Sequence, residues 1–163
     1  MMLSSRILNL SILVVGKSPE LRELQHSLQW QRRKMNIKGD MKIDLCEVIT
    51  DVLSSEKAAV YHDFVVLTFD MRMFEINNEI RSALKKLKKQ VHLHRVCLLS
   101  VVDVPSYEQR IDYDDISKFT EKYGIPCIFG DIRCKVKCLY LAERILTLVS
   151  ATMGLKTGRP TIF

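Results

Sequence analysis

Short, continuous apolar runs alternate along the chain with longer segments in which apolar residues recur every three or four positions. The first pattern is typical of buried strands, and the second of helices that lay one face on a sheet. Strands are predicted at residues 10–15, 41–49, 63–69, 96–102 and 127–129. Helices are predicted at about 19–34, 75–90, 112–123 and 135–153. This order predicts an α/β fold with a mostly parallel, doubly wound sheet and flanking helices.

The first strand ends at Gly16 and turns directly into a helix, as the strand of a phosphate-binding loop does. Residues 16–18 are Gly-Lys-Ser, the last letters of G-x-x-x-x-G-K-[ST], but in a working loop those letters follow four residues that wrap the phosphates. If Gly16 is instead the first Gly, then Leu21, Arg22 and Glu23 take the second Gly, Lys and hydroxyl positions. A carboxylate there would repel phosphate. The pattern indicates a nucleotide-binding architecture without its nucleotide site.

Ser18 and Pro19 fit the N-cap and first position of the helix that follows. A helix that begins there leaves no residues to cradle phosphates. We therefore expect no bound nucleotide, and no cofactor of another kind is indicated.

Composition points to one globular domain over residues 1–153, followed by a short tail at 154–163. The chain has 163 residues, 47% of them hydrophobic, which is enough for one core. Five cysteines, an odd number, favour reduced thiols in the cytosol or nucleus. Arg6 and the apolar run after it imitate a signal peptide, but no small-residue cleavage site follows. No apolar stretch reaches the ~18 residues of a membrane span, so no membrane association is expected.

The sequence favours neither a metal site nor a catalytic site. Cys134 and Cys138 lie one helical turn apart, with Cys127 nearby and His92 and His94 in another segment, but no paired C-x-x-C supports zinc. Free cysteines commonly behave as small buried hydrophobes. No Ser or Cys stands in a recognisable nucleophile motif either. We expect no metal, no catalytic residues and no enzyme activity.

The predicted helix at 75–90 carries a small basic face. Its cations are Arg81, Lys85, Lys86, Lys88 and Lys89, and Arg95 follows the helix. Aromatic residues that would stack on bases are not interleaved with them. The net charge of +6 favours acidic partners. A solvated helix face is the preferred interpretation, with direct nucleic-acid contact weak at most.

Three segments resemble the centromere protein M family. They are KFTEKYGIPCIFGDIRCKVKCLYLAERILTLV at 118–149, VCLLS at 96–100 and HDFVVLTFD at 62–70. The resemblance implies a Ras-like (P-loop GTPase-like) fold whose nucleotide site is degenerate. It also implies a non-enzymatic subunit of the inner kinetochore (CCAN) that binds CENP-I, CENP-H and CENP-K, serves chromosome segregation and lies in the nucleus at the centromere.

Position-by-position comparison with small GTPases supports the loss of nucleotide binding. The guanine-reading N-K-x-D falls on residues 100–103, Ser-Val-Val-Asp, so only Asp103 is retained. The S-A-K element falls near residues 131–133, Asp-Ile-Arg. The alternative is an active small GTPase or an atypical nucleotide-binding protein. A receiver-like or flavodoxin-like module is a third possibility, but it would place clustered acids after the first strand.

The last helix offers two apolar stripes where one would cover a sheet. The first contains Cys138, Leu141, Ile145 and Leu148, and the second contains Leu139, Ala142, Leu146, Val149 and Met153. The candidate partner-binding residues are Leu93, Leu139, Leu146, Val149, Ile162 and Phe163. The alternative is that Ile162 and Phe163 fold back and bury the second stripe within the domain.

Overall fold

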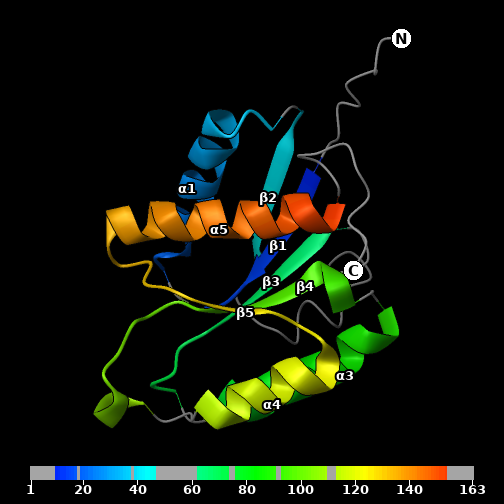
Figure 1. The fold of residues 1–163 in the computed structure, drawn as a ribbon, viewed down its shortest axis with the longest axis vertical. Coiled ribbons are helices and arrows are strands. Elements are labelled where there is room, and N and C mark those ends of the chain that lie inside the picture. Colours follow the sequence, from blue (N-terminus) through cyan, green and yellow to red (C-terminus); the bar gives the residue numbers. More distant parts are fainter. Residues whose placement is uncertain are drawn as a thin grey trace.

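The computed structural model describes residues 10–17, 19–37, 39–46, 62–73, 76–90, 93–109 and 113–153, without the side chains of 76, 77, 86, 88–90, 93 and 106. The strands are β1 (Leu10–Val15), β2 (Met41–Cys46), β3 (Phe64–Phe69), β4 (Val96–Ser100) and β5 (Cys127–Phe129). The helices are α1 (Leu21–Lys34), α3 (Ile76–Gln90), α4 (Tyr113–Tyr123) and α5 (Lys135–Met153). Two 3₁₀ turns, η1 (Leu93–Arg95) and η2 (Ser106–Glu108), flank β4 (Figure 1).

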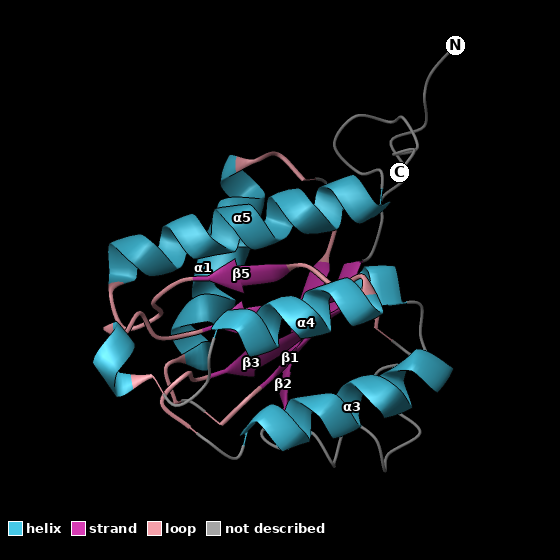
Figure 2. Cartoon of the chain, turned by 60° about the horizontal axis from the view of Figure 1, so that its bottom comes forward, coloured by secondary structure: helices cyan, strands magenta, loops and turns pink. Residues whose placement is uncertain are grey.

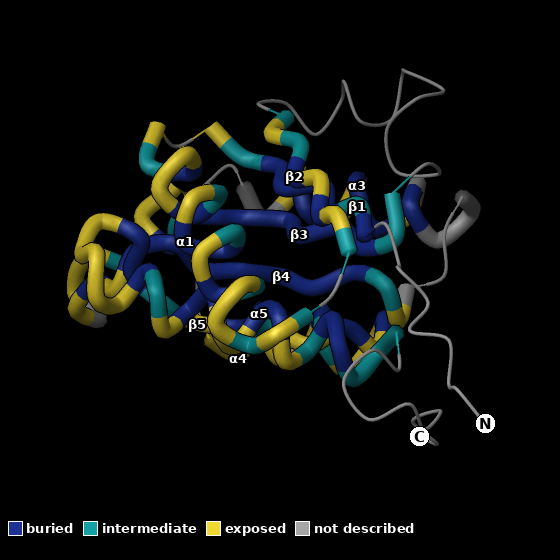
Figure 3. Tube along the Cα trace, turned by 90° about the horizontal axis from the view of Figure 1, so that it is seen from above, coloured by how far each residue is buried: buried dark blue, intermediate teal, exposed yellow. Residues whose placement is uncertain are grey.

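The sheet has five strands in the order β2-β1-β3-β4-β5, and every neighbouring pair is parallel. Its apolar runs are buried on both faces; β3 and β4 are buried at every position. Figure 3 shows β3 and β4 as the buried centre of the molecule. The predicted Ras-like, doubly wound α/β class is confirmed. The strand order reverses between β1 and β3, and in such sheets ligands bind at the carboxyl ends beside this reversal.

Helices cover both faces of the sheet. Helices α1 and α5 lie on one face, and α3 and α4 lie on the other (Figure 2). Apolar side chains at three- and four-residue steps make the inner stripe of each helix, for example Ile116, Phe119 and Tyr123 in α4.

Helix α5 packs against α1 as well as against the sheet. Gln31 Nε2 of α1 donates to the Leu139 carbonyl at 3.0 Å, and Ser27 Oγ lies 3.5 Å from Cys138 Sγ. Leu146 and Val149 are completely buried. The second apolar stripe of α5 is therefore part of the domain core, because this helix meets two neighbours. The expectation that Leu146 and Val149 face a partner is wrong.

The start of α1 differs from the sequence prediction. The helix begins at Leu21 rather than at Pro19, and Glu20 is the N-cap, without a side-chain capping hydrogen bond. Pro19 and Glu20 form a turn before the helix, a place that suits the fixed φ of proline as well as the first helical turn does. Ser18, the predicted N-cap, lies outside the described residues.

Turn chemistry between the elements follows the sequence closely. Asn36 has φ 54° and Gly39 φ 102° in the connection from α1 to β2, and Gly124 ends α4 with φ 65°. Positive φ is available to Gly at little cost and to Asn more readily than to most residues.

Candidate functional site

The carboxyl ends of β1, β3, β4 and β5 meet at one edge of the sheet, which we call the carboxyl edge. Gly16 follows β1, Asp70 follows β3, Val101 follows β4, and Gly130 and Asp131 follow β5. This is the edge where a doubly wound fold places its ligand. Any nucleotide site of this chain would have to be built here.

Gly16 is a glycine because a side chain of β3 approaches it closely. Thr68 Oγ1 donates to the Val15 carbonyl at 2.6 Å, which places the hydroxyl beside Gly16. A Cβ atom at Gly16 would lie 1.8 Å from Thr68 Oγ1, far inside van der Waals contact. Packing between β1 and β3 thus accounts for this glycine without any phosphate to accommodate.

The start of α1 carries negative charge where a nucleotide would place its phosphates. A helix N-terminus attracts anions through its free N–H groups and its dipole. Here the N-cap is Glu20 and the first turn contains Glu23. Like charges 4 Å apart repel by about 1 kcal/mol in water and about 4 kcal/mol near a protein surface. These carboxylates therefore disfavour phosphate at this helix.

Asp131, just after β5, is buried and accepts four hydrogen bonds. Arg133 donates from its backbone N–H (2.9 Å), Nε (3.0 Å) and Nη2 (2.8 Å), and the Asp103 N–H donates at 3.4 Å. The bonds from Arg133 lower the pKa of Asp131 from 3.8 to about 2 against the opposing effect of burial. Arg133 Nη2 also donates to the Asp103 carbonyl at 3.3 Å. This network, the Asp131–Arg133 pair, occupies the positions of the S-A-K element and the terminal Asp of N-K-x-D.

A second acid–arginine pair follows β3. Arg72 donates to the Asp70 carboxylate from its backbone N–H, Nε and Nη2, the last at 2.7 Å. Burial raises the pKa of Asp70, but these bonds and the charges of Arg72 and Arg133 lower it overall. The hydrogen bond to Asp131 and the charges of Asp131, Asp70 and Glu20 raise the pKa of Arg133. Both arginines are thus engaged by the protein's own carboxylates.

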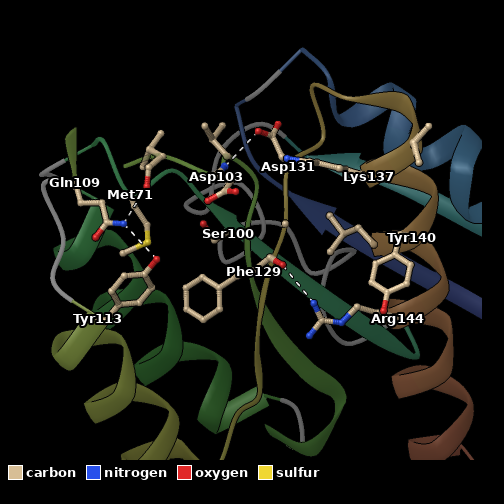
Figure 4. A pocket seen from close by; sticks show the side chains of 15 residues that line it. Met71, Ser100, Asp103, Gln109, Tyr113, Phe129, Asp131, Lys137, Tyr140 and Arg144 are labelled. Carbon is tan, nitrogen blue, oxygen red and sulfur yellow. Dashed lines mark hydrogen bonds between the residues drawn. The ribbon is translucent and has the colours of Figure 1, made fainter. Parts of the chain in front are cut away.

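Beside these pairs lies a mainly apolar groove of about 460 Å³ between α4 and α5. Figure 4 shows Gln109 and Tyr113 on one side, Tyr140 and Arg144 on the other, and Phe129 between them. The groove is lined by Met71, Ser100, Val102, Asp103, Val104, Gln109, Tyr113, Phe129, Gly130, Asp131, Val136, Lys137, Tyr140, Leu141 and Arg144. It lies where the N-K-x-D and S-A-K positions meet, which is the base side of a small-GTPase site.

Sequence reasoning missed this groove. Val136 and Tyr140 lie four residues apart on α5, outside both of its apolar stripes. They are large apolar residues, and they are 75% and 65% exposed. That exposed apolar pair was the available signal in the sequence, because neither residue belongs to a stripe that packs on the sheet. The remaining lining residues come from segments far apart in the sequence.

Within the described part of the chain, the partner-binding candidates do not form one exposed surface. Leu146 and Val149 lie in the core, and Leu139 is half-buried against α1. Leu93 is in η1, but its side chain is outside the described set, as are Ile162 and Phe163 entirely. The interface prediction therefore stays a prediction for Leu93, Ile162 and Phe163.

Cysteines and histidines do not gather into a metal site within the described residues. Cys134 is exposed, while Cys138 and Cys97 are buried. Burial raises the pKa of Cys127 to about 12 and raises that of Cys97 further. These two thiols are protonated at neutral pH, so they are poor ligands and poor nucleophiles.

A family model described as centromere protein M (CENP-M) matches residues 8–162. The chain belongs to the centromere protein M family. Membership, which confirms the resemblance seen in the sequence, makes it a protein of the centromere and kinetochore and places it in the nucleus. Comparison with curated protein sequences gives no significant match. None of the helices in the described part of the chain is long and apolar enough to cross a membrane.

Proposed function

We propose that the protein is a non-enzymatic pseudo-GTPase subunit of the inner kinetochore that binds CENP-I, CENP-H and CENP-K type partners and supports chromosome segregation. The observation that carries the proposal is the charge arrangement of the carboxyl edge. The Asp131–Arg133 pair lies within electrostatic reach of Glu20 and Asp70, and Asp70 is itself held by Arg72.

This arrangement opposes nucleotide binding in two ways. Small GTPases and related NTPases stabilise phosphate charge with backbone N–H groups, a lysine and Mg²⁺. Here Glu20 and Glu23 add negative charge at the helix that would receive the phosphates. Arg72 and Arg133, at the same edge of the sheet, already bond to Asp70 and Asp131. A phosphate that bound either arginine would have to displace the carboxylate from its pair.

The alternative is an active small GTPase or an atypical nucleotide-binding protein. One observation favours this alternative: the groove beside Asp103 is an apolar space large enough for a nucleotide base. Isothermal titration calorimetry with GTP and with ATP, each with Mg²⁺, separates the two proposals. We expect no heat of binding for either nucleotide. Micromolar affinity for one of them would establish the alternative.

Assembly with protein partners is tested by co-purification with a recombinant complex of CENP-H, CENP-I and CENP-K. We expect the wild-type chain to co-elute with the complex. Leu93→Glu and Ile162→Glu should each weaken this association while the isolated domain stays folded. Lys118→Glu, which reverses a charge at an exposed position of α4, serves as the control.

Two results of that experiment would count against the proposal at different levels. Failure of the wild-type chain to co-elute would refute the partner assignment. Unchanged affinity of folded Leu93→Glu and Ile162→Glu variants would refute only this interface. Leu146→Glu is not informative about partners, because Leu146 is buried in the core.

A further inference from the structure

Exposed apolar side chains are concentrated at the groove between α4 and α5. Of the large hydrophobic residues exposed in the described chain, half line it, namely Tyr113, Phe129, Val136 and Tyr140. The others, Trp30, Leu45, Met73 and Tyr107, do not line it. A contiguous exposed apolar patch with a polar rim is typical of a protein-interaction site, and tyrosine is common among the residues that dominate binding energy.

The walls of the groove are held in place by their own hydrogen bonds. Gln109 Nε2 donates to the Val104 carbonyl at 3.1 Å and to Tyr113 Oη at 3.2 Å. The rings of Tyr113 and Phe129 lie 5.4 Å apart, and Arg144 Nη1 donates to the Phe129 carbonyl at 3.3 Å. A groove fixed in this way loses little conformational entropy when a ligand enters it.

The α5 side of the groove is positively charged. Lys137 and Arg144 line it, and the exposed Lys135 lies in the same helical turn as Lys137. No carboxylate of the described residues forms a salt bridge with any of these three cations. The acids of the groove lie toward the carboxyl edge: Asp131 is neutralised by Arg133, and Asp103 also lines the groove there.

We propose that this groove docks a short acidic segment of a protein partner. A large apolar side chain of that segment enters between Tyr113 and Tyr140 over Phe129, and its carboxylates lie against Lys137 and Arg144. The inference rests on the proposed role as a protein-binding subunit and adds a second contact surface to it. A nucleotide is disfavoured because its phosphates would meet Glu20 and Glu23. A nucleic-acid backbone is disfavoured because the groove is mainly apolar and only Lys137 and Arg144 among its lining residues are cations, which suits an apolar side chain flanked by a few carboxylates better than a run of phosphates.

Site-specific crosslinking tests the occupant directly. The photo-reactive residue p-benzoylphenylalanine replaces Tyr140 in the chain assembled with purified CENP-H, CENP-I and CENP-K, and mass spectrometry locates the crosslink. We expect one partner segment rich in Asp and Glu that contains a large apolar residue. A crosslink to a basic segment, a crosslink only to added DNA, or no crosslink from an assembled complex would each overturn the proposal.

Affinity measurements give an independent readout. Tyr140→Ala and Lys137→Glu should each lower the affinity for the complex about tenfold, and raising the salt concentration should weaken wild-type binding. Lys118→Glu, which changes the same charge on α4 away from the groove, should leave the affinity unchanged. Both groove side chains are exposed, so thermal melting should show an intact fold.

The outcomes distinguish this inference from the proposed function. If the wild-type chain binds the complex and both folded groove variants bind equally well, the groove proposal is wrong and the partner assignment stands. If the wild-type chain does not bind the complex at all, the proposed function fails and the groove proposal fails with it.

Discussion

Arg133 holds Asp131 in a two-pronged contact, with Nε 3.0 Å from Oδ1 and Nη2 2.8 Å from Oδ2, at the end of the last strand of the sheet. This pair stands where a small GTPase backs its guanine base. The carboxyl edge thus contains charged groups that bind one another, and the neighbouring groove offers an apolar surface instead of a phosphate cradle.

The first prediction concerns the acid stability of the fold. The pKa of Asp131 is about 2 in the folded chain, below its ordinary value of 3.8. Stability from this group is therefore fully present above about pH 5 and is lost as the pH falls toward 2. The shift corresponds to about 2 kcal/mol at most, and less after solvent screening at the half-exposed Arg133. Urea unfolding at pH 7 and pH 3 measures the loss.

Asp131→Asn is the control for this prediction because the amide cannot ionise. The variant should be less stable than the wild-type chain at pH 7, and its free energy of unfolding should fall less between pH 7 and pH 3. Identical pH dependence of the two proteins would show that the Asp131–Arg133 pair does not carry the effect.

The second prediction concerns Gly16. Gly16→Ala should destabilise the fold by about 1–3 kcal/mol, because the new methyl group would overlap Thr68 Oγ1. Adding Thr68→Ala should recover part of the loss, although that change removes the hydrogen bond to the Val15 carbonyl. Chemical denaturation of the single and double variants gives the coupling energy.

Gly124→Ala is the matched control. A Cβ atom at Gly124 has nothing within 4 Å, but φ is +65°, so the cost of about 1 kcal/mol comes from the backbone alone. It should not couple to Thr68→Ala. Additive effects of Gly16→Ala and Thr68→Ala would contradict the proposed contact.

The third prediction separates the core of α5 from its surface. Leu146→Ala should lower the free energy of unfolding by about 2–5 kcal/mol, because Leu146 is completely buried. Leu148→Ala is the same chemical change at a half-buried position of the same helix and should cost less. Thermal or urea unfolding measures both. Equal, small losses would mean that Leu146 does not pack as the structure shows.

The fourth prediction concerns nucleic acid. The isolated protein should bind DNA weakly, without sequence preference and with steep salt dependence, because dispersed cations contact phosphates only. Lys85→Glu on the exposed face of α3 should reduce this binding uniformly across sequences. Fluorescence anisotropy at several salt concentrations checks it. Tight, salt-resistant and sequence-selective binding would refute a purely electrostatic contact.

Local sequence pattern was sufficient for the elements of this fold and their order. The boundaries of β1, β5 and α5 agree with their predicted ranges, and the parallel class follows from alternating buried strands and one-faced helices. The departure of residues 16–23 from the phosphate-binding motif could also be recognised in the sequence, because the spacing of residues within a short loop is a local property. Such features depend on neighbours along the chain.

Three features were decided only by tertiary structure. The second stripe of α5 is part of the core because α1 packs against it. The periodicity of α5 alone does not show that a second helix covers Leu146 and Val149. The reason for a glycine at position 16 is the close approach of Thr68, which is distant in sequence. The groove joins Met71, Tyr113 and Tyr140 from separate elements, and the spacing of one segment carries no information about which other segments lie across from it.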